Sequence, residues 1–273
     1  MPELPEVETV RRQLAKRLEG ATVVEIEIWR SGREFPIGEE FIEVLIGHRV
    51  ISIERRAKLL VWRFENETAL TAHLKMTGRF VFVGEGYERQ KHDRIRFVFE
   101  REGERIVLVW ADVRQFGFLK LVSSEGLQEI LEGYGPEPLG VSAEELAKCF
   151  ARPSSRSIKA LLLDQTVLAG VGNIYADEAC YRAGIRPMRV ATKVTVKERL
   201  RLAQEVQTIL TESIAQQGTS ANDYVDTQGE KGGFLELLRV YGREGEPCRT
   251  CEQPIIRVVH VQRGTHYCAN CQT

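Results

Sequence analysis

Four of the six cysteines stand in two close pairs near the C-terminus. Two residues separate Cys248 from Cys251 and Cys268 from Cys271, and sixteen residues separate the two pairs. This spacing is typical of a four-thiolate zinc site, in which a hairpin brings two tight turns together. Four thiolates leave no open coordination position, so we expect one structural Zn²⁺. The alternatives are two disulfides, which the lack of a secretory signal disfavours, and a redox dithiol, which the presence of two pairs disfavours.

The first residues could supply a different chemistry, that of an amine beside a carboxyl group. Met1 before a small residue is normally removed, which would leave Pro2 with a free secondary amine. An α-amine has a pKa of roughly 8 against about 10.4 for lysine, so more of it is a neutral nucleophile near neutral pH. Attack on a sugar C1′ would displace a base and leave an iminium that acidifies the C2′ proton. Elimination of the 3′ and then the 5′ phosphate would follow.

Such an attack needs a carboxyl group that moves protons to the departing base and the opening sugar, and Glu3 is adjacent. Ordinary helix-entry chemistry is the alternative for the Pro2-Glu3 pair. Glu6 lies three residues on, on the same helical face, where it could support the amine. A solvated first-turn carboxylate, favoured by the helix dipole, is the alternative for Glu6.

The composition is that of a globular protein. The chain has 273 residues, of which 43% are hydrophobic and 28% charged, which excludes disorder, collagen and coiled coil. The length suggests one large or two ordinary domains. No apolar run approaches the roughly 20 residues of a membrane helix, and we expect a cytoplasmic protein. Cys149 and Cys180 stand alone and are expected to be small buried side chains.

The formal net charge is −1, but the charges are segregated along the chain. Residues 1–48 carry six basic and ten acidic side chains, whereas residues 49–63 carry five basic side chains against Glu54 alone. Residues 152–160 add Arg152, Arg156 and Lys159 without an acid. One such cluster is usually a solvated face, but several in one chain favour contacts with phosphates.

The hydrophobic period predicts a change of structure along the chain. Residues 5–19 have the helical period, and after them short segments alternate with period two up to about Val122. This favours an antiparallel sandwich or barrel behind a leading helix. The Pro- and Gly-rich stretch around residues 134–140 is the best candidate for a linker.

Beyond this linker the chain is expected to be helical. Capping-box signatures at Ser142 and Thr195 predict helices near 143–151 and 196–216. Two further segments, Ser157–Ala169 and Ile174–Ala183, lie between them. Residues 218–233 form a long polar loop of the kind that usually has a function. In the tail, a hairpin is expected around Gly264, from segments Ile255–Val261 and Thr265–Cys268.

Three segments together resemble bacterial formamidopyrimidine-DNA glycosylase, a relative of endonuclease VIII: residues 1–8, residues 164–175 and residues 262–268. The resemblance implies an α+β fold: an antiparallel β-sandwich with a leading helix, a helix–two-turns–helix domain, and a four-cysteine zinc hairpin. It also implies a monomeric enzyme that removes 8-oxoguanine and formamidopyrimidines from duplex DNA and cuts the abasic strand by β,δ-elimination. The expected domains are residues 1–132, a linker 133–141, residues 142–236 with a lesion-covering loop 218–233, and residues 237–273.

The resemblance also implies roles for individual residues. Pro2 would be the nucleophile that forms a Schiff base, Glu3 the acid/base residue, with Glu6 supporting them; Lys58 would contact phosphate and assist elimination. Further DNA contacts would come from His73, Asn173, Tyr241 and Arg263. Asn173 could instead be a helix N-cap, or serve as both. Met76, Arg114 and Phe116 would fill the space left by an extruded base, because their neighbours read as polar, Gly-containing turns.

The sequence departs from the family pattern at Thr77, at Gln115 and at Asn222-Asp223. These changes bear on the lesion preference and not on strand cleavage. An endonuclease VIII type, specific for oxidised pyrimidines, is the nearest alternative, although Leu4 follows the purine-specific pattern. A non-catalytic DNA-binding protein on the same scaffold would not need Pro2, Glu3 and Lys58. A zinc-ribbon adaptor for RNA or protein would explain the cysteines but not the N-terminus.

Overall fold

The computed structural model describes residues 1–30, 37–151, 155–221 and 223–273, which form two compact units. Unit 1 comprises Met1–Glu132 and Gln217–Gly233, and unit 2 comprises Gly133–Gln216 and Phe234–Thr273. The loop 218–233 therefore groups with unit 1, although it lies within the predicted domain 142–236 along the sequence. The four-part domain division remains a prediction. Within the described residues, no helix is both long and apolar enough to cross a membrane.

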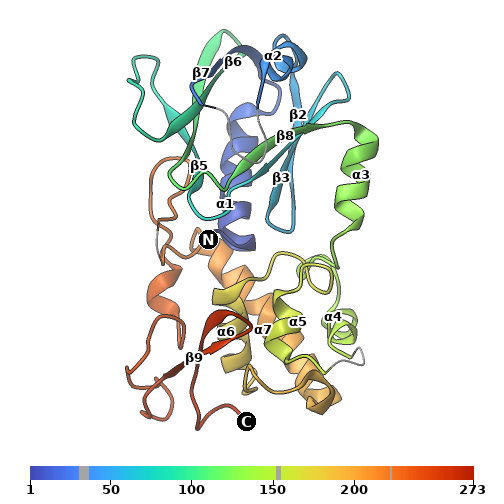
Figure 1. The fold of residues 1–273 in the computed structure, drawn as a ribbon, viewed down its shortest axis with the longest axis vertical. Helices are drawn as coiled ribbons and strands as arrows, with labels where there is room; N and C mark the ends of the chain where they lie inside the picture. Colours follow the sequence, from blue (N-terminus) through green and yellow to red (C-terminus); the bar gives the residue numbers. More distant parts are fainter. Residues whose placement is uncertain (31–36, 152–154, 222) are drawn as a thin grey trace. The chain divides into compact units, whose positions relative to one another are not determined.

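Unit 1 begins with helix α1, Leu4–Leu18, close to the predicted range. Pro5 lies in its first turn, where a missing N–H costs nothing, and Gly20 follows its end with a φ of +84°. The apolar face of α1 is buried in the core of the unit, and the helix packs against β2 and β3 (Figure 1). Residues at the start of α1 are thereby held on a rigid element.

The rest of unit 1 is a sandwich of two antiparallel four-stranded sheets, in the orders β1-β6-β7-β5 and β2-β3-β4-β8. The strands are β1 Thr22–Ile28, β2 Val50–Arg56, β3 Leu59–Phe64, β4 Ala69–His73, β5 Gly78–Val83, β6 Asp93–Arg101, β7 Glu104–Asp112 and β8 Phe118–Val122. Their inner faces share one core, in which Trp62 of one sheet meets Phe80 of the other at 5.5 Å between ring centroids. The predicted sandwich is confirmed.

Two short helices of unit 1 were not predicted. They are α2, Glu39–Leu45, and α3, Ser124–Glu132. Leu127 of α3 packs on the outer face of the second sheet, against Leu59, Val61 and Ala69.

Unit 2 contains the predicted helices. They are α4 Ala143–Cys149, α5 Ile158–Leu163, α6 Asn173–Arg182 and α7 Val196–Ala215, with 3-10 turns η1 Ala191–Lys193 and η2 Phe234–Leu237. Both predicted capping boxes, at Ser142 and Thr195, are formed. The expected burial of the lone cysteines holds for Cys180 but is wrong for Cys149, which is partly exposed because Leu146 and Phe150 occupy the inner face of α4.

The segment 157–169 is helical only as far as Leu163. The carboxylate of Asp164 accepts hydrogen bonds from the backbone and hydroxyl of Thr166, at 2.9 and 2.7 Å, and so stabilises a turn. Gln165 then ties that turn to the backbone oxygen of Val171 at 2.9 Å. The result is two short helices joined by a hydrogen-bonded double turn.

The tail forms a hairpin of β9, Ile256–His260, and β10, Arg263–Tyr267. The prediction that the hairpin turns at Gly264 is wrong, because Val261 and Gln262 make the two-residue turn, with φ of 47° and 58°. Positive φ at both positions matches the twist that a tight hairpin needs. Gly264 lies inside β10, where an added Cβ would come 3.1 Å from the guanidinium of Arg257.

Candidate active site and nucleic-acid interface

The start of α1 buries both carboxylates of the predicted catalytic segment. Glu3 is 2% exposed and Glu6 is 1% exposed, and Pro2 beside them is buried as well. The backbone N–H of Glu3 donates to Oε2 of Glu6 at 2.7 Å. A buried carboxylate is costly unless it is hydrogen-bonded, so this arrangement excludes a solvated first-turn role for Glu6.

The second oxygen of Glu6 binds the beginning of the 217–233 segment, which is the predicted loop 218–233 together with Gln217. Its Oε1 accepts the backbone N–H of Thr219 at 2.7 Å. Gly218 allows this approach, because it has a φ of +89° and an added Cβ would lie 2.9 Å from the Glu6 side chain. Glu6 therefore connects the N-terminal residues to a segment more than 200 positions away.

Lys58 lies in the turn just before β3 of the second sheet, and His73 ends the neighbouring strand β4. Lys58 is only 7% exposed, and the next residue, Leu59, pairs with His73 across β3 and β4. The ring Nδ1 of His73 accepts the backbone N–H of Lys75 at 2.9 Å. Burial, together with the charges of Lys75 and Lys58, lowers the pKa of His73 to about 3. His73 is therefore neutral near pH 7, with its proton on Nε2, where it is a hydrogen-bond donor rather than a cation.

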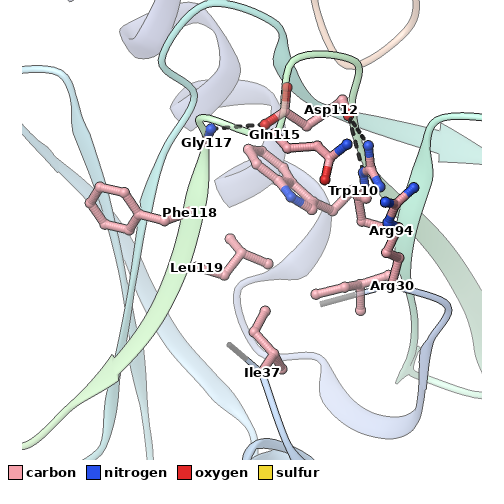
Figure 2. Close-up of a pocket in the computed structure, with 10 residues that line it drawn as sticks. Arg30, Ile37, Arg94, Trp110, Asp112, Gln115, Gly117, Phe118 and Leu119 are labelled. Atoms are coloured by element: carbon pink, nitrogen blue, oxygen red, sulfur yellow. Dashed lines mark hydrogen bonds between the residues drawn. The ribbon is translucent and has the colours of Figure 1, made fainter. Parts of the chain in front are cut away.

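Asp112, at the end of β7, organises two turns at the edge of the sandwich (Figure 2). Its Oδ2 accepts the N–H of Gly117 at 2.8 Å, and its Oδ1 accepts the hydroxyl of Thr77 at 2.5 Å. The Thr77 hydroxyl in turn accepts the N–H of Arg114 at 2.9 Å. The departure from the family pattern at Thr77 thus supplies the hydrogen bond that joins the 75–77 turn to the 113–117 turn.

The two turns present the residues predicted to intercalate. Phe116 is 46% exposed, and Arg114 is exposed beside it, with its guanidinium carbon 4.9 Å from the centre of the Phe116 ring. Met76 is half-buried in the other turn. The prediction that these segments are turns between strands is confirmed, whereas their role on DNA remains a prediction.

A small cavity lies under the 113–117 turn, and Arg94, Trp110, Asp112 and Leu119 are among the residues that line it (Figure 2). Its volume is about 20 Å³. This is room for about one water molecule and far below the several hundred Å³ of a ligand pocket. The cavity is therefore not a site for a base.

In unit 2, Asn173 is attached to the zinc hairpin. Its Nδ2 donates to the backbone oxygen of Gly264 at 2.9 Å. The alternative that Asn173 is an N-cap is wrong, because Gly172 is the N-cap of α6 and Asn173 is the first helical residue. The side chain therefore reaches across to β10 rather than capping its own helix.

Most of the predicted basic clusters are neutralised by ion pairs. Lys159 is wholly buried, 2.6 Å from Asp177, and donates to the hydroxyl of Thr265 at 2.8 Å, so it is a structural link to β10 and not part of a phosphate-binding surface. Arg152 lies outside the described residues. Further pairs are Arg49–Glu65, Arg55–Glu8, Arg63–Glu54 and Arg156–Asp164. Charge clustering in the sequence therefore overstates the basic surface of this fold.

The remaining predicted DNA contacts of unit 2 lie along the hairpin. Arg263 is exposed and directly follows the turn, where it pairs with His260. Tyr241 packs edge-on against the ring of His266 at 5.0 Å. The carboxylate of Glu178 receives the N–H groups of residues 239–241, and burial raises its pKa despite these bonds.

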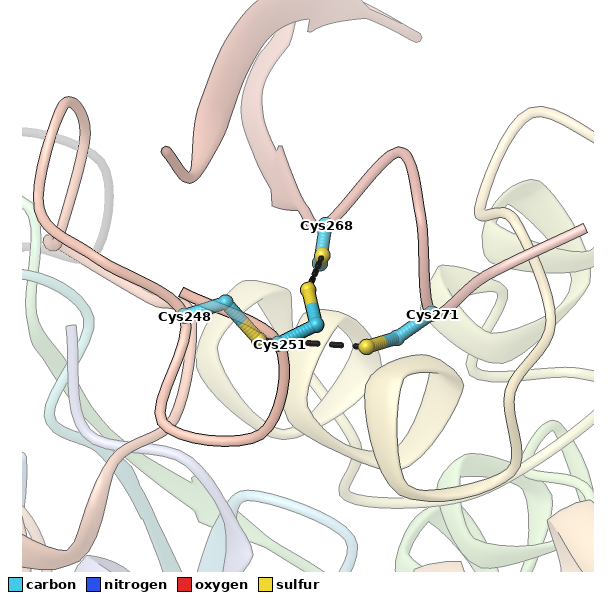
Figure 3. Close-up of side chains that lie close together, drawn as sticks. All are labelled: Cys248, Cys251, Cys268 and Cys271. Atoms are coloured by element: carbon cyan, nitrogen blue, oxygen red, sulfur yellow. Dashed lines mark hydrogen bonds between the residues drawn. The ribbon is translucent and has the colours of Figure 1, made fainter. Parts of the chain in front are cut away.

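The four paired cysteines lie close together, as Figure 3 shows. All four sulfur atoms are within 4.8 Å of one another, with Cys248 Sγ 3.9 Å from Cys271 Sγ and Cys251 Sγ 3.4 Å from Cys268 Sγ. A tetrahedral zinc with Zn–S bonds of about 2.3 Å requires sulfur separations of about 3.8 Å. The cysteines therefore fit one structural zinc, as predicted.

Sequence reasoning missed the residues that position the others, notably Asp112, Asp177 and Glu178. Asp112 had a usable signal, because an aspartate whose side chain binds the N–H two residues on is a common start of a turn. Asp177 and Glu178 had none, because they lie in a helix and the backbone N–H groups that they bind belong to residues more than 60 positions away.

Comparison with known proteins agrees with this arrangement. Residues 1–119 match the model of the formamidopyrimidine-DNA glycosylase N-terminal domain, residues 134–224 the H2TH domain of the same enzyme, and residues 245–273 the zinc finger found in FPG and IleRS. The chain is 43% identical to formamidopyrimidine-DNA glycosylase of Desulfitobacterium hafniense, over all of both chains.

Two solved structures of the Lactococcus lactis enzyme resemble this fold closely. A point mutant of that enzyme with Fapy-dG-containing DNA is 32% identical, with a TM-score of 0.90 and full coverage of both chains. The wild-type enzyme with DNA containing an oxidised pyrimidine is 32% identical, with a TM-score of 0.89 and the same coverage. On the strength of these matches along its whole length, the chain belongs to the formamidopyrimidine-DNA glycosylase family.

Proposed function

We propose that this protein is a base-excision repair enzyme that removes oxidised purines from duplex DNA and then cleaves the abasic strand, acting as a monomer. The observation that carries the proposal is the buried start of α1, where Pro2 precedes two carboxylates that are 2% and 1% exposed. The two side chains form a capping box, but a helix entry alone does not require both of its carboxylates to be withdrawn from water. A protein that only binds DNA would not need this arrangement.

In the proposed reaction, removal of Met1 frees the amine of Pro2, whose nitrogen attacks C1′ of the damaged nucleotide. The N-glycosidic bond breaks with its electron pair going to the base, and the Glu3 carboxyl group donates a proton. The Pro2 nitrogen then loses its proton, and the C1′–O4′ bond opens with its electron pair going to O4′, which takes up a proton. The iminium formed between the nitrogen and C1′ acidifies the C2′ proton, whose loss expels the 3′ phosphate, and a second elimination expels the 5′ phosphate. Glu6 orients this end of the helix through the N–H of Glu3.

Both units would contact the DNA backbone. In unit 1, the ammonium of Lys58 and the Nε2–H of neutral His73 are suited to phosphate oxygens. In unit 2, the N-terminus of α6, the amide of Asn173 and the guanidinium of Arg263 are suited to the same groups. The zinc ion would stabilise the hairpin that holds Arg263 and take no part in the chemistry.

The two turns held by Asp112 would fill the gap that an extruded nucleotide leaves. Extrusion costs a few kcal/mol of stacking and pairing, and inserted side chains offset that cost. Phe116 and Met76 would supply apolar surface and Arg114 a cation facing the orphaned base. The exposure of Phe116 and Arg114 on a hydrogen-bonded turn supports this role, because a large aromatic side chain exposed to water is unfavourable.

Oxidised pyrimidines are a second candidate substrate class. The observation that favours them is that the Lactococcus lactis relative has been crystallised with DNA containing an oxidised pyrimidine. Single-turnover excision from matched duplexes that carry a formamidopyrimidine, 8-oxoguanine or thymine glycol distinguishes the two classes. We expect the two purine lesions to be excised faster, and preferential excision of thymine glycol would contradict the purine assignment.

Replacing Glu3 tests the enzymatic part of the proposal on the same duplexes. We expect Glu3→Gln to lower the excision rate by about 10²- to 10⁴-fold, the usual contribution of a general acid. Binding to lesion DNA should remain, because the amide keeps the shape of the side chain. The exposed Glu125→Gln on α3 is the matched control and should be silent. If Glu3→Gln excised the base at the wild-type rate, Glu3 would be a residue of the helix start and not the acid of the reaction.

Replacing Arg263 tests the contact of the hairpin with phosphate. Arg263→Ala should weaken DNA binding and lower the slope of log affinity against log salt by about one unit, as expected for one lost phosphate contact. Arg243→Ala is a control of equal charge change, because Arg243 is already paired with Glu246 at 2.8 Å. Binding titrations at several salt concentrations measure both slopes. If the slope for Arg263→Ala were unchanged, Arg263 would be a solvated residue beside the turn and would not contact phosphate.

A further inference from the structure

Gln13, which no motif singled out, is a second point at which helix α1 holds the 217–233 segment. It lies seven residues, or about two helical turns, beyond Glu6 and so on the same face of the helix. Glu6 binds the start of the segment through the N–H of Thr219. Gln13 binds its later part through Asp226 and Thr227. One helix thus carries the N-terminal residues and both attachments of the segment.

Both the NH₂ group and the oxygen of the Gln13 amide are hydrogen-bonded to the segment. Its Nε2 donates to Oδ2 of Asp226 at 2.7 Å, and its Oε1 accepts the N–H and the hydroxyl of Thr227 at 3.0 and 2.7 Å. Asp226 is 2% exposed and Thr227 is fully buried. Hydrogen bonds to buried groups are costly to leave unmade, so this contact strongly restricts where the segment lies.

The attached part of the segment is itself a closed turn. Oδ1 of Asp226 accepts the N–H groups of Gln228 and Glu230, at 2.8 and 2.9 Å, and the Asp226 N–H donates to the oxygen of Glu230 at 2.9 Å. The oxygen of Thr227 then accepts the N–H of Phe82 on β5 at 2.9 Å. Hydrogen bonds within the turn, to α1 and to the first sheet therefore hold the turn in place.

Tyr224, which lies between the two attachments, contacts the backbone of Glu6. The hydroxyl of Tyr224 donates to the backbone oxygens of Gln217 and Glu6, at 3.2 and 3.4 Å. If Pro2 attacks C1′, the base bonded to that carbon must lie within a few bond lengths of Glu3. Because Glu6 is hydrogen-bonded to both Glu3 and Thr219, the segment that Gln13 positions would then lie beside this base.

We propose that Gln13 is a positioning residue for base excision, which acts by fixing residues 219–221 and 223–226 through Asp226 and Thr227. This inference rests on the proposed function. An extruded base is present only in the excision step, whereas an abasic sugar has no base to be held. Loss of the Gln13 contact should therefore slow excision and leave strand cleavage at a preformed abasic site nearly unchanged.

The contact offers a test by exchange of its polar groups. Gln13→Glu places a carboxylate next to the Asp226 carboxylate, so that two acceptors face each other. Asp226→Asn places an amide NH₂ next to the Gln13 NH₂, so that two donors face each other. Each single change therefore removes the hydrogen bond between the two side chains. In the double variant, the new amide at position 226 donates to the new carboxylate at position 13, and the acceptors for Thr227, Gln228 and Glu230 are kept. Lys16→Gln, at an exposed position of the same helix, is the control for the change of one charge.

Two rates are measured under single-turnover conditions for each variant: excision of a formamidopyrimidine, and cleavage at a preformed abasic site. Each single variant should lose about tenfold or more in excision, the effect of one hydrogen bond to a buried charged group, and less than about twofold in cleavage. The double variant should recover most of the excision rate, and Lys16→Gln should match wild type. Singles that excise normally, or a double that does not recover, would overturn the proposal. A wild-type protein that performs neither reaction would instead overturn the proposed function.

Discussion

Pro2→Gly is expected to abolish strand cleavage, and an N-terminal tag that prevents removal of Met1 is expected to have the same effect. The tag converts the amine into an amide, which has no nucleophilic lone pair. The glycine variant loses the ring that fixes the direction of the nitrogen and the secondary amine that forms a permanently charged iminium. A displacement of a reacting group by about 1 Å already costs roughly 10²-fold, so the loss should be at least that large.

The measurement is the single-turnover rate of strand cleavage on lesion and abasic duplexes. Pro5→Ala is the matched control, because Pro5 is also a buried proline of the first turn of α1 but does not provide the N-terminal amine. Its rate should stay close to that of wild type. Wild-type cleavage by a protein that demonstrably retains Met1 would contradict the nucleophile assignment.

Cys268→Ser is expected to lose the zinc ion, to unfold the tail locally and to abolish DNA binding while the sandwich stays folded. Among the described residues, the tail packs in a small apolar cluster, formed by Val240, Ile255 and buried cysteines with Tyr181 of α6. Metal binding, on the order of 10–16 kcal/mol in small zinc domains, therefore supplies most of the stability of the tail. Without it, Arg263 and the contacts of Gly264 with α6 lose their framework.

Zinc content, near-ultraviolet circular dichroism and affinity for lesion DNA should be measured together. Cys149→Ser is the matched control, because Cys149 lies outside the cluster and is partly exposed on α4. It should retain one zinc per chain and normal affinity. Normal DNA binding by zinc-free Cys268→Ser would show that the hairpin is not part of the DNA-binding surface.

The features that the sequence predicted well are those with short-range causes. The period of α1, the alternation of the strands and the capping boxes at Ser142 and Thr195 each depend on residues a few positions apart. Helices α2 and α3, of seven and nine residues, are too short for a period to be recognised. The hairpin turn was misplaced because glycine is the usual residue at positive φ, and here Val261 and Gln262 adopt it instead.

The features that the sequence could not predict are contacts between distant segments. The sequence places Lys159 in a basic cluster, but in the structure it is wholly buried, where Asp177 neutralises it and Thr265 accepts a hydrogen bond from it. Gln13 has no motif at all, because its partner lies 213 positions away. The candidate site was therefore predicted residue by residue at the N-terminus and the cysteines, whereas the groups that position it became visible only in the folded chain.

The most direct test of the central claim is to identify the atom that becomes bonded to DNA. Wild-type protein is incubated with a duplex that carries a formamidopyrimidine in the presence of borohydride, which reduces an iminium to a stable bond. The trapped complex is digested and its peptides are analysed by mass spectrometry. We predict a sugar adduct on the nitrogen of Pro2, on a chain that lacks Met1. An adduct on Lys58 or another lysine, or no adduct while the strand is still cleaved, would contradict the account.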